Sequence, residues 1–229
     1  MLMEKSQELR HLGIIADGNR RWARERGLPT IEGHKKGLEI IEMLVGEAMN
    51  AGVEYITFYV FSTENWGRSE AEVSGIMRLA SMRILALAKK MAKNNVKLVI
   101  LGAKSRVDPK LMSLMEQAES ITADCDGVTT CFCFNYGGEQ EIADSANIAL
   151  EVDGEITPAT IRAHLYHPEI PDVDMVVRTS GEERISGFML WRSAYAELMF
   201  LEKYFPEMTA DDMGVIIAEY EKRNRRFGK

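Results

Sequence analysis

A carboxylate, a glycine, an amide and two arginines follow a short apolar run near the beginning of this sequence. The run that begins at Leu12 predicts a buried strand, and Asp17-Gly18-Asn19 predicts a turn before a helix that begins with Arg20-Arg21. A carboxylate at the end of a strand can share Mg²⁺ with phosphate oxygens, and arginines bind phosphate through paired N–H groups. The segment therefore predicts a site for a phosphorylated ligand and a divalent metal, with a plain strand–turn–helix corner as the alternative.

Three further polar segments follow predicted strands. They are residues 62–68 after the strand at 55–61, residues 135–138 after the strand at 128–134, and residues 178–182 after the strand at 173–177. In a parallel sheet, ligands bind beyond the carboxyl ends of the strands. We therefore expect the four segments to line one shared cleft.

Arginines are frequent at these strand ends, although the chain carries a net charge of −7. A single surface arginine is usually a solvated charge, but a group of them on an acidic background indicates a local anion site. We expect one subsite with Arg21 and Arg68, and another with Arg178, Arg184 and the Ser186 hydroxyl. Asp17 and Glu197 are candidate metal ligands, although Glu197 alone is equally consistent with pairing to an arginine.

The strands alternate with helices along the whole sequence. Beyond the segments named above, the pattern predicts strands at 96–101 and 195–200 and helices at 32–51, 70–94, 109–123, 139–150 and 210–223, with a further short helix capped by Thr157. Such alternation implies right-handed crossovers and a largely parallel sheet. The fold class is therefore α/β, a single domain over residues 1–229 with a mostly parallel sheet of about six strands flanked by helices.

Composition narrows the function. The acidic net charge argues against general nucleic-acid binding, and there is no run of about 20 apolar residues that could span a membrane. The three cysteines, Cys125, Cys131 and Cys133, have no paired metal-ligand spacing and are expected to be reduced thiols of a cytoplasmic protein, the last two on one face of a strand. The phosphate-loop, dinucleotide and nucleophile-elbow motifs are absent, which disfavours kinases, nicotinamide enzymes and serine hydrolases.

Four segments in order resemble the cis-prenyltransferases of the undecaprenyl diphosphate synthase (isoprenyl transferase) family. They are residues 11–23 (HLGIIADGNRRWA), 61–68 (FSTENWGR), 135–138 (NYGG) and 178–186 (RTSGEERIS), the last followed by Leu190-Trp191 and Ala194-Tyr195-Ala196-Glu197. The resemblance extends over nearly the whole chain. It implies an enzyme that condenses isopentenyl diphosphate with an allylic diphosphate such as farnesyl diphosphate, in an α/β fold with an apolar tunnel.

The resemblance also implies roles for individual residues. Asp17 would be catalytic and would position Mg²⁺ with Glu197 as the second metal carboxylate, and Asn65 would lie where the proton leaves. The allylic diphosphate would be held by Gly18, Asn19, Arg20, Arg21, His34 and Arg68. Ser62, Thr63 and Glu64 would lie beside Asn65, and Trp22 and Trp66 would flank the prenyl chains. Isopentenyl diphosphate would be held by Arg178, Arg184, Ile185 and Ser186.

The family also implies a homodimer in which Arg226 and Gly228 complete the isopentenyl site, and contact with a membrane at the mouth of the tunnel when the product is released. Thr30 stands where many members carry an arginine for the allylic diphosphate. Val60 and Phe134 are bulky, and Ala80 small, relative to long-chain members, so a product shorter than undecaprenyl diphosphate is the alternative to a cell-wall lipid carrier. A non-catalytic partner subunit and a lipid-binding protein are the remaining hypotheses.

Overall fold

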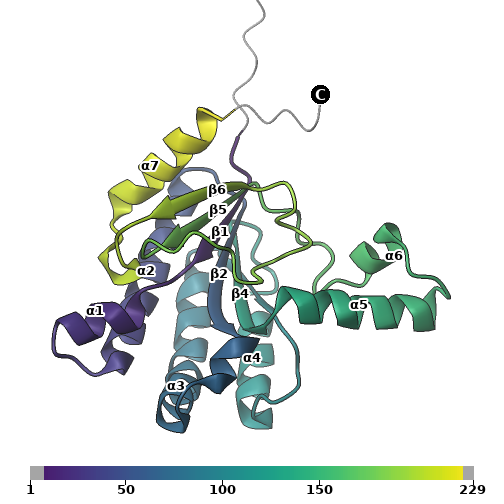
Figure 1. Ribbon diagram of the computed structural model, residues 1–229, viewed down its shortest axis with the longest axis horizontal. Coiled ribbons are helices and arrows are strands. Elements are labelled where there is room, and N and C mark those ends of the chain that lie inside the picture. Colours follow the sequence, from purple (N-terminus) through teal and green to yellow (C-terminus); the bar gives the residue numbers. More distant parts are fainter. Residues whose placement is uncertain (1–7, 224–229) are drawn as a thin grey trace, which may run out of the picture.

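Six parallel strands form the centre of the protein (Figure 1). The computed structural model describes residues 8–223. The strands are β1 (His11–Ile15), β2 (Tyr55–Ser62), β3 (Lys97–Leu101), β4 (Thr129–Tyr136), β5 (Met175–Thr179) and β6 (Glu197–Leu201). Their order in the sheet is β3-β4-β2-β1-β5-β6, and every neighbouring pair runs parallel. β1 thus lies in the interior of the sheet, with β2 on one side and β5 on the other.

The two faces of the sheet are covered differently. One face packs against helices from the first half of the chain and the C-terminal helix, and the other packs mainly against the irregular segment between α6 and β6. The helices are α1 (Asn19–Glu25), α2 (Thr30–Asn50), α3 (Glu70–Lys93), α4 (Pro109–Ile121), α5 (Gly138–Val152), α6 (Pro158–Ala163) and α7 (Ala210–Glu221), with short 3₁₀ helices η1 (Thr63–Gly67) and η2 (Phe205–Glu207).

The larger core lies between the sheet and helices α2, α3, α4 and α7. Alternate residues of the strands point into it, among them Ile14, Phe58 and Val177, which are fully buried. The second core lies on the opposite face and contains Cys131 and Cys133. The expectation that these two cysteines share one face of a strand is confirmed, and both are free thiols.

The sequence predicted the type and order of these strands and helices. Thr157 caps α6 as expected, because its hydroxyl accepts a hydrogen bond from the Thr160 N–H at 3.2 Å. The two 3₁₀ helices were not predicted. The strand expected at 173–177 instead runs from Met175 to Thr179, so Arg178 lies inside a buried strand and not in the loop after it.

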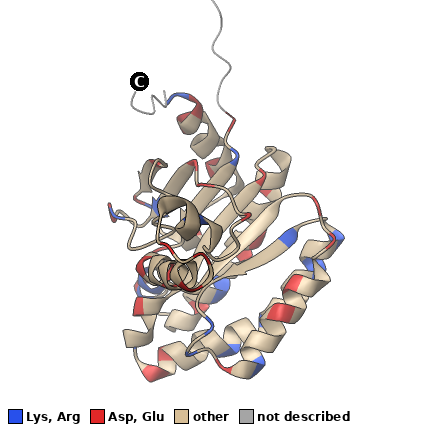
Figure 2. Ribbon diagram, turned by 90° about the vertical axis from the view of Figure 1, so that its right-hand side faces the viewer, with Lys and Arg blue, Asp and Glu red and all other residues tan. Residues whose placement is uncertain are grey.

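Acidic and basic residues are interspersed along the helices (Figure 2). No helix within residues 8–223 is long and apolar enough to cross a membrane.

Candidate active site

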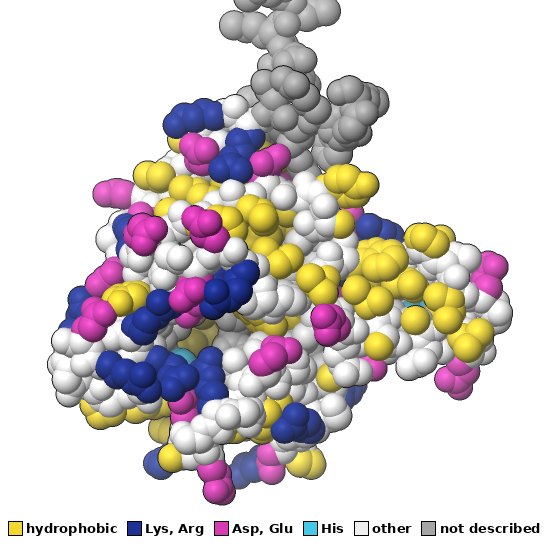
Figure 3. All heavy atoms as spheres, in the orientation of Figure 1, with side chains coloured by type: hydrophobic (Ala, Val, Ile, Leu, Met, Phe, Trp, Pro, Cys, Tyr) yellow, Lys and Arg dark blue, Asp and Glu magenta, His cyan; other side chains and the backbone are white. Residues whose placement is uncertain are grey.

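A cleft of about 980 Å³ opens at the carboxyl ends of the strands. All four polar segments expected there contribute to its lining, through residues 17–21, residues 62–65 with Arg68, residues 137–138, and Arg178. Residues 139–140 and Ser186, just beyond these segments, line it as well. In the space-filling view, basic side chains and histidine surround a hollow in this region (Figure 3). The shared cleft inferred from the sequence is therefore present.

Asp17 lies at the centre of the polar part of this cleft. Its Oδ2 atom accepts a hydrogen bond from Arg178 at 2.8 Å, and Oδ1 accepts one from the Gly18 N–H at 2.7 Å and lies 3.5 Å from Arg21. Partial burial alone would raise the pKa of Asp17, but the hydrogen bond and positive charge of Arg178, the Gly18 N–H and the charge of Arg21 lower it below its ordinary value. The carboxylate is therefore ionised at neutral pH.

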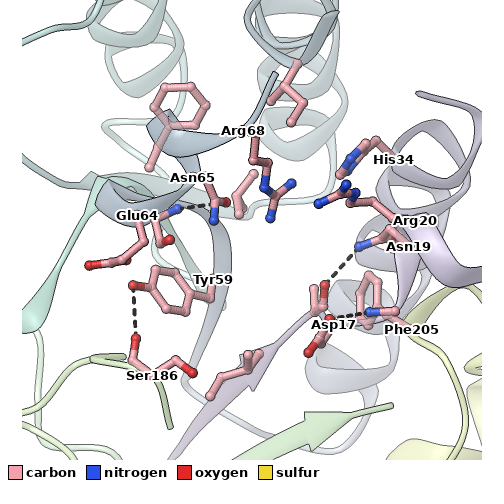
Figure 4. Close-up of a pocket in the computed structure, with 18 of the residues that line it drawn as sticks. Asp17, Asn19, Arg20, His34, Tyr59, Glu64, Asn65, Arg68, Ser186 and Phe205 are labelled. Atoms are coloured by element: carbon pink, nitrogen blue, oxygen red, sulfur yellow. Dashed lines mark hydrogen bonds between the residues drawn. The ribbon is translucent and has the colours of Figure 1, made fainter. Parts of the chain in front are cut away.

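The backbone around Asp17 is fixed by β5 and by η2. Thr179 accepts from the Asp17 N–H at 3.0 Å and donates its hydroxyl to the Asp17 carbonyl at 2.7 Å, and Phe205 donates its N–H to the same carbonyl (Figure 4). Gly18 has a φ of +100°, and a Cβ there would lie 2.6 Å from the Tyr204 ring. Only glycine allows this turn, which holds the start of α1 against the end of β1.

Arg178 connects Asp17 to the loop after β5. One terminal nitrogen donates to Asp17, and the other donates to the Arg184 carbonyl at 2.6 Å and to the Ser186 hydroxyl at 2.8 Å. The side chain is almost completely buried, and its Nε atom has no hydrogen-bond partner. Arg21 approaches the same loop, where it donates to Ser180 and lies 3.3 Å from Glu182. Arg21, Arg178 and Ser186 therefore form the first cationic group of the cleft.

A second cationic group lies on the other side of Asn19. Arg20, His34 and Arg68 converge there from α1, from α2 and from the residue after η1 (Figure 4). All three surround one carboxylate, Glu72 of α3, whose Oε1 atom lies 2.9 Å from Arg68, 3.3 Å from Arg20 and 3.9 Å from His34. The expected pairing of Arg21 with Arg68 is therefore wrong, because Arg21 contacts Asp17 and the loop after β5 whereas Arg68 contacts α3.

His34 is neutral in this arrangement. Burial lowers its pKa to about 4, and the positive charges of Arg68 and Arg20 add to this effect, while Glu72 opposes it. Its Nε2 atom is buried and has no hydrogen-bond partner. A buried ring nitrogen without a partner, placed beside two guanidinium groups, is suited to contact an anionic oxygen.

The packing of α1 against α2 brings this group together. A Cβ on Gly33 would lie only 2.0 Å from the Asn19 carbonyl oxygen, and one on Gly37 would lie 2.6 Å from the Asn19 side chain. Two glycines one helical turn apart thus let the beginning of α1 contact α2 directly. The Asn19 amide also donates to the Ala16 carbonyl at 2.8 Å, which ties the turn to β1.

The third part of the cleft is η1. Asn65 caps this helix, because its Oδ1 accepts from the Ser62 N–H at 3.3 Å. Thr63 donates to Glu64 at 2.9 Å. Tyr59, in the second half of β2, was not predicted as a site residue but lines the cleft, with its hydroxyl 3.2 Å from the Tyr136 carbonyl oxygen and 3.4 Å from that of Ser186. Burial raises the pKa of Tyr59, which therefore stays protonated.

Beyond these polar groups the lining is apolar. The residues that contribute come from α2, β2, α3 and β4 and are Leu38, Ile41, Val60, Ile76, Leu79, Ala80 and Phe134. One part of the cleft is thus lined by cationic side chains and Asp17, and another part is lined by apolar side chains. Val60, Ala80 and Phe134, singled out from the sequence for product length, are all in this apolar part.

The two predicted tryptophans do not line the cleft. Trp22 lies in a neighbouring groove between α1, α2 and α3, which shares Leu38 and Leu79 with the apolar lining of the cleft, and Arg26 stacks 4.8 Å above its ring. Trp66 donates its indole N–H to Asn135 at 2.7 Å and is covered by Arg106 at 4.9 Å. Neither ring is part of the cleft lining itself, and the expectation that both rings flank an apolar ligand stays a prediction.

Three residues from the C-terminal half also lie outside the cleft lining. Arg184 is largely exposed and pairs with Glu182 at 2.7 Å, although its carbonyl accepts from Arg178. Ile185 packs against the second core. Glu197 is the first residue of β6, whereas Asp17 follows the last residue of β1. Because the strands are parallel, the two carboxylates lie at opposite ends of the strands. Within one chain they do not share a metal.

Glu197 instead pairs with Arg223 at 3.1 Å. Pairing with an arginine was the alternative to metal binding that the sequence left open for Glu197. Arg226 and Gly228 lie outside the described residues. Glu72 and Tyr59 were missed because nothing distinguishes them locally: glutamate is ordinary in the first turn of a helix, and tyrosine is ordinary in a strand.

The donors around Asp17 fit a divalent cation only in part. Mg²⁺ is commonly held by one or two carboxylates together with substrate phosphates. Asp17 supplies one ionised carboxylate between two groups of cations suited to phosphate, and no cluster of three or more acidic, histidine or cysteine ligands occurs within residues 8–223. A metal held jointly by Asp17 and a bound diphosphate fits this arrangement, and a cage made of protein ligands alone does not.

The fold and the cleft define an α/β protein that holds anionic groups at the carboxyl edge of a parallel sheet, next to an apolar space. Comparison with known proteins gives the family. Residues 15–228 match the family model described as putative undecaprenyl diphosphate synthase. The chain belongs to this family and is a prenyltransferase.

Its relatives include isoprenyl transferases from distant bacteria. The one from Neisseria gonorrhoeae is 40% identical over 229 residues, which cover 100% of this chain and 92% of the relative. The one from Thermotoga maritima is 41% identical over 223 residues, covering 95% of this chain and 96% of the relative. The family inferred from the four sequence segments is therefore confirmed.

Solved structures agree with this. Lavandulyl diphosphate synthase from Lavandula x intermedia, in complex with dimethylallyl diphosphate, superposes with a TM-score of 0.90 at 30% identity and covers 96% of this chain and 98% of its own. A probable undecaprenyl diphosphate synthase from Campylobacter jejuni gives a TM-score of 0.85 at 31% identity, covering 97% of this chain and 100% of its own.

Proposed function

We propose that this prenyltransferase condenses isopentenyl diphosphate with an allylic diphosphate, farnesyl diphosphate by preference, to give a cis-polyprenyl diphosphate. The observation that carries the proposal is a pair of cationic groups in one cleft, the first in contact with Asp17 and the second on the other side of Asn19, next to an apolar lining. Two diphosphates that must react with each other require two anion subsites side by side, and their hydrocarbon parts require apolar surroundings.

The residues divide the work as follows. Arg20, His34 and Arg68 would hold the allylic diphosphate, and Arg21, Arg178 and Ser186 would hold isopentenyl diphosphate. The allylic carbon–oxygen bond breaks, the double bond of isopentenyl diphosphate supplies the electron pair for the new carbon–carbon bond, and the proton that leaves the condensed intermediate beside Asn65 passes to an oxygen of the released diphosphate. The guanidinium groups stabilise the charge of the departing diphosphate, and the apolar lining keeps water from the developing cation.

Mg²⁺ is the metal proposed for this site. When bound, it would supply additional positive charge to the departing diphosphate. Asp17 would hold it together with diphosphate oxygens, since its carboxylate is ionised and lies between the two cationic groups. Arg178 keeps that carboxylate oriented through the 2.8 Å hydrogen bond to Oδ2.

The test is a turnover assay with farnesyl diphosphate, radiolabelled isopentenyl diphosphate and Mg²⁺. Asp17→Asn should lower kcat/KM by at least about a hundredfold, a loss of about 2.7 kcal/mol of transition-state stabilisation, and chelation of the metal should stop turnover reversibly. Asp172→Asn is the matched control, because Asp172 also pairs with an arginine at 2.8 Å but is exposed and does not line the cleft. Full activity in Asp17→Asn would refute the proposal.

Product length divides two versions of this function. Undecaprenyl diphosphate, the lipid carrier for cell-wall sugars, is the first, and a short-chain cis-prenyl diphosphate is the second. The second is supported by Val60 and Phe134, bulky side chains in the apolar lining. Chromatography of the products separates them: a long polyprenyl product from the wild-type protein would refute the short-chain version. The absence of product with any allylic primer would favour a non-catalytic partner subunit or lipid-binding protein.

We also propose a homodimer that assembles through the surface of α5, its following loop and β6. Large apolar side chains are exposed there, and Figure 3 shows yellow side chains gathered over the region from which α5 and α6 project. They are Ile148, Leu150, Val152, Ile156, Tyr195 and Leu198. Light scattering with the wild-type protein and a Leu150→Lys/Val152→Lys variant tests this: the variant should be monomeric, and a monomeric wild-type protein would refute it.

The proposed location is the cytoplasm, with peripheral membrane contact while the product is released. An apolar product that leaves an open cleft supports such contact. Sedimentation with vesicles, with and without turnover, measures it, and equal sedimentation in both conditions would contradict the coupling to release.

A further inference from the structure

One buried carboxylate joins three elements that the sequence keeps apart. Glu72 lies in the first turn of α3, and its side chain is only 8% exposed. A single atom, Oε1, contacts Arg68 after η1, Arg20 of α1 and, at 3.9 Å, His34 of α2. α1, α2, α3 and η1 therefore meet at this oxygen.

Glu72 lies behind the cations and not among the residues that line the cleft. Arg20, His34 and Arg68 all line the cleft, whereas Glu72 does not. Arg20 contacts Glu72 through Nε, so this ion pair leaves its two terminal nitrogens free to face elsewhere. Figure 4 shows the Arg20 and Arg68 guanidinium groups directed toward each other beside His34.

Two like charges held this close repel each other, and each arginine has many rotamers when it is unrestrained. A single oxygen atom, Oε1 of Glu72, contacts both guanidinium groups and fixes both side chains before a ligand arrives. Such preorganisation strengthens binding, because less side-chain freedom is lost when the anion binds. The same negative charge weakens the attraction for an anion, so the position and the charge of Glu72 have opposite effects on affinity.

We propose that Glu72 is a positioning residue of the allylic diphosphate subsite, which it preorganises by holding Arg20 and Arg68 from behind. This inference rests on the proposed function, since it names the ligand of that subsite. The effect of position exceeds the effect of charge, because Arg20 and Arg68 come from different elements and Glu72 joins them directly.

Three substitutions separate the two effects. Glu72→Ala removes both the contact and the charge, Glu72→Gln keeps an acceptor oxygen at the same reach without the charge, and Glu72→Asp keeps the charge but withdraws the oxygen by one methylene. Glu70→Ala is the matched control, because Glu70 lies in the same first turn of α3 and is exposed. Thermal melts of each variant report whether the fold is kept.

The readout is binding of farnesyl thiodiphosphate, an unreactive allylic analogue, and of isopentenyl diphosphate, measured by calorimetry. Glu72→Ala and Glu72→Asp should weaken farnesyl thiodiphosphate at least about tenfold and change isopentenyl diphosphate less than about twofold. Glu72→Gln should bind the analogue as tightly as the wild type or more tightly, and Glu70→Ala should be unchanged.

Two results would overturn the inference. Wild-type affinity in folded Glu72→Asp would show that position does not matter, and an equal loss in Glu72→Gln and Glu72→Ala would show that the charge itself is needed. The proposed function is tested separately by wild-type turnover. The wild-type protein could make no prenyl product while the variants lose analogue binding as described. That result would refute the proposed reaction and still support the role of Glu72 in the anion subsite.

Discussion

Arg192→Met is expected to destabilise the fold more than any surface substitution, because it breaks a completely buried ion pair. Arg192 and Glu141 are both 0% exposed, and Nη1 of Arg192 lies 2.7 Å from Oε1 of Glu141. Arg192 also donates to the carbonyl oxygens of Tyr166, His167 and Ile170. It thereby ties the segment after α6 to the loop that carries Ser186.

The magnitude follows from what the substitution leaves behind. Methionine fills much of the volume but leaves the Glu141 carboxylate buried without its counter-charge, and removing one partner of a buried pair costs about 3–5 kcal/mol. For a protein of 229 residues, 1 kcal/mol corresponds to about 2–4 °C in Tm, so Arg192→Met should lower Tm by about 6–20 °C. Glu141→Gln should have a similar cost, since it leaves a buried guanidinium.

Urea denaturation and thermal melts of the two single variants and the double variant measure this. The double variant should be more stable than the sum of the single effects predicts, with a coupling of about 1–3 kcal/mol. Arg162→Met is the control, because the Arg162–Asp172 pair is exposed, and it should cost less than about 1 kcal/mol. A cost below about 1 kcal/mol for Arg192→Met, or additive effects in the double variant, would refute the reasoning.

Two further predictions concern the packing of α1 on α2 and the buried histidines. Gly33→Ala should lower the free energy of unfolding by about 1–3 kcal/mol and impair turnover, because its Cβ would collide with the Asn19 carbonyl. Gly46→Ala in the same helix is the control, because its Cβ meets open space, and it should be neutral or stabilising. Equal urea midpoints for the two variants would contradict this prediction. Burial lowers the pKa of both His11 and His34 from 6.5 to about 4. The stability that their neutral forms contribute is therefore complete above pH 6.5 and is lost as the pH falls toward 4. An unchanged urea midpoint between about pH 7.5 and pH 5 would contradict this prediction.

Local sequence was sufficient to predict the strands and helices and the end of the strands at which the site forms. Alternating apolar strands and amphipathic helices predict a parallel α/β sheet, and polar groups at the ends of parallel strands must meet at one edge. These patterns alone predict that Asp17, Asn65 and Ser186 lie in one cleft. Thr157 is a similar case, because a cap depends on residues three positions apart.

The partners of the charged residues depended on the tertiary structure. Arg20 and Arg21 are adjacent in sequence, yet Arg20 contacts α3 and Arg21 contacts the loop after β5, because neighbouring residues on a helix point about 100° apart. Glu197 and Asp17 lie at opposite ends of the parallel strands, because Glu197 begins β6 and Asp17 follows the end of β1.

The sequence by itself determined the class of fold, the cleft and the residue types within it, since these follow from patterns only a few positions long. Only the tertiary structure decided that Glu72 lies behind Arg20 and Arg68, that Arg178 is held inside β5, and that Trp66 bonds to Asn135. Ion pairs and hydrogen bonds between distant segments depend on the packing of whole elements, which short patterns do not encode.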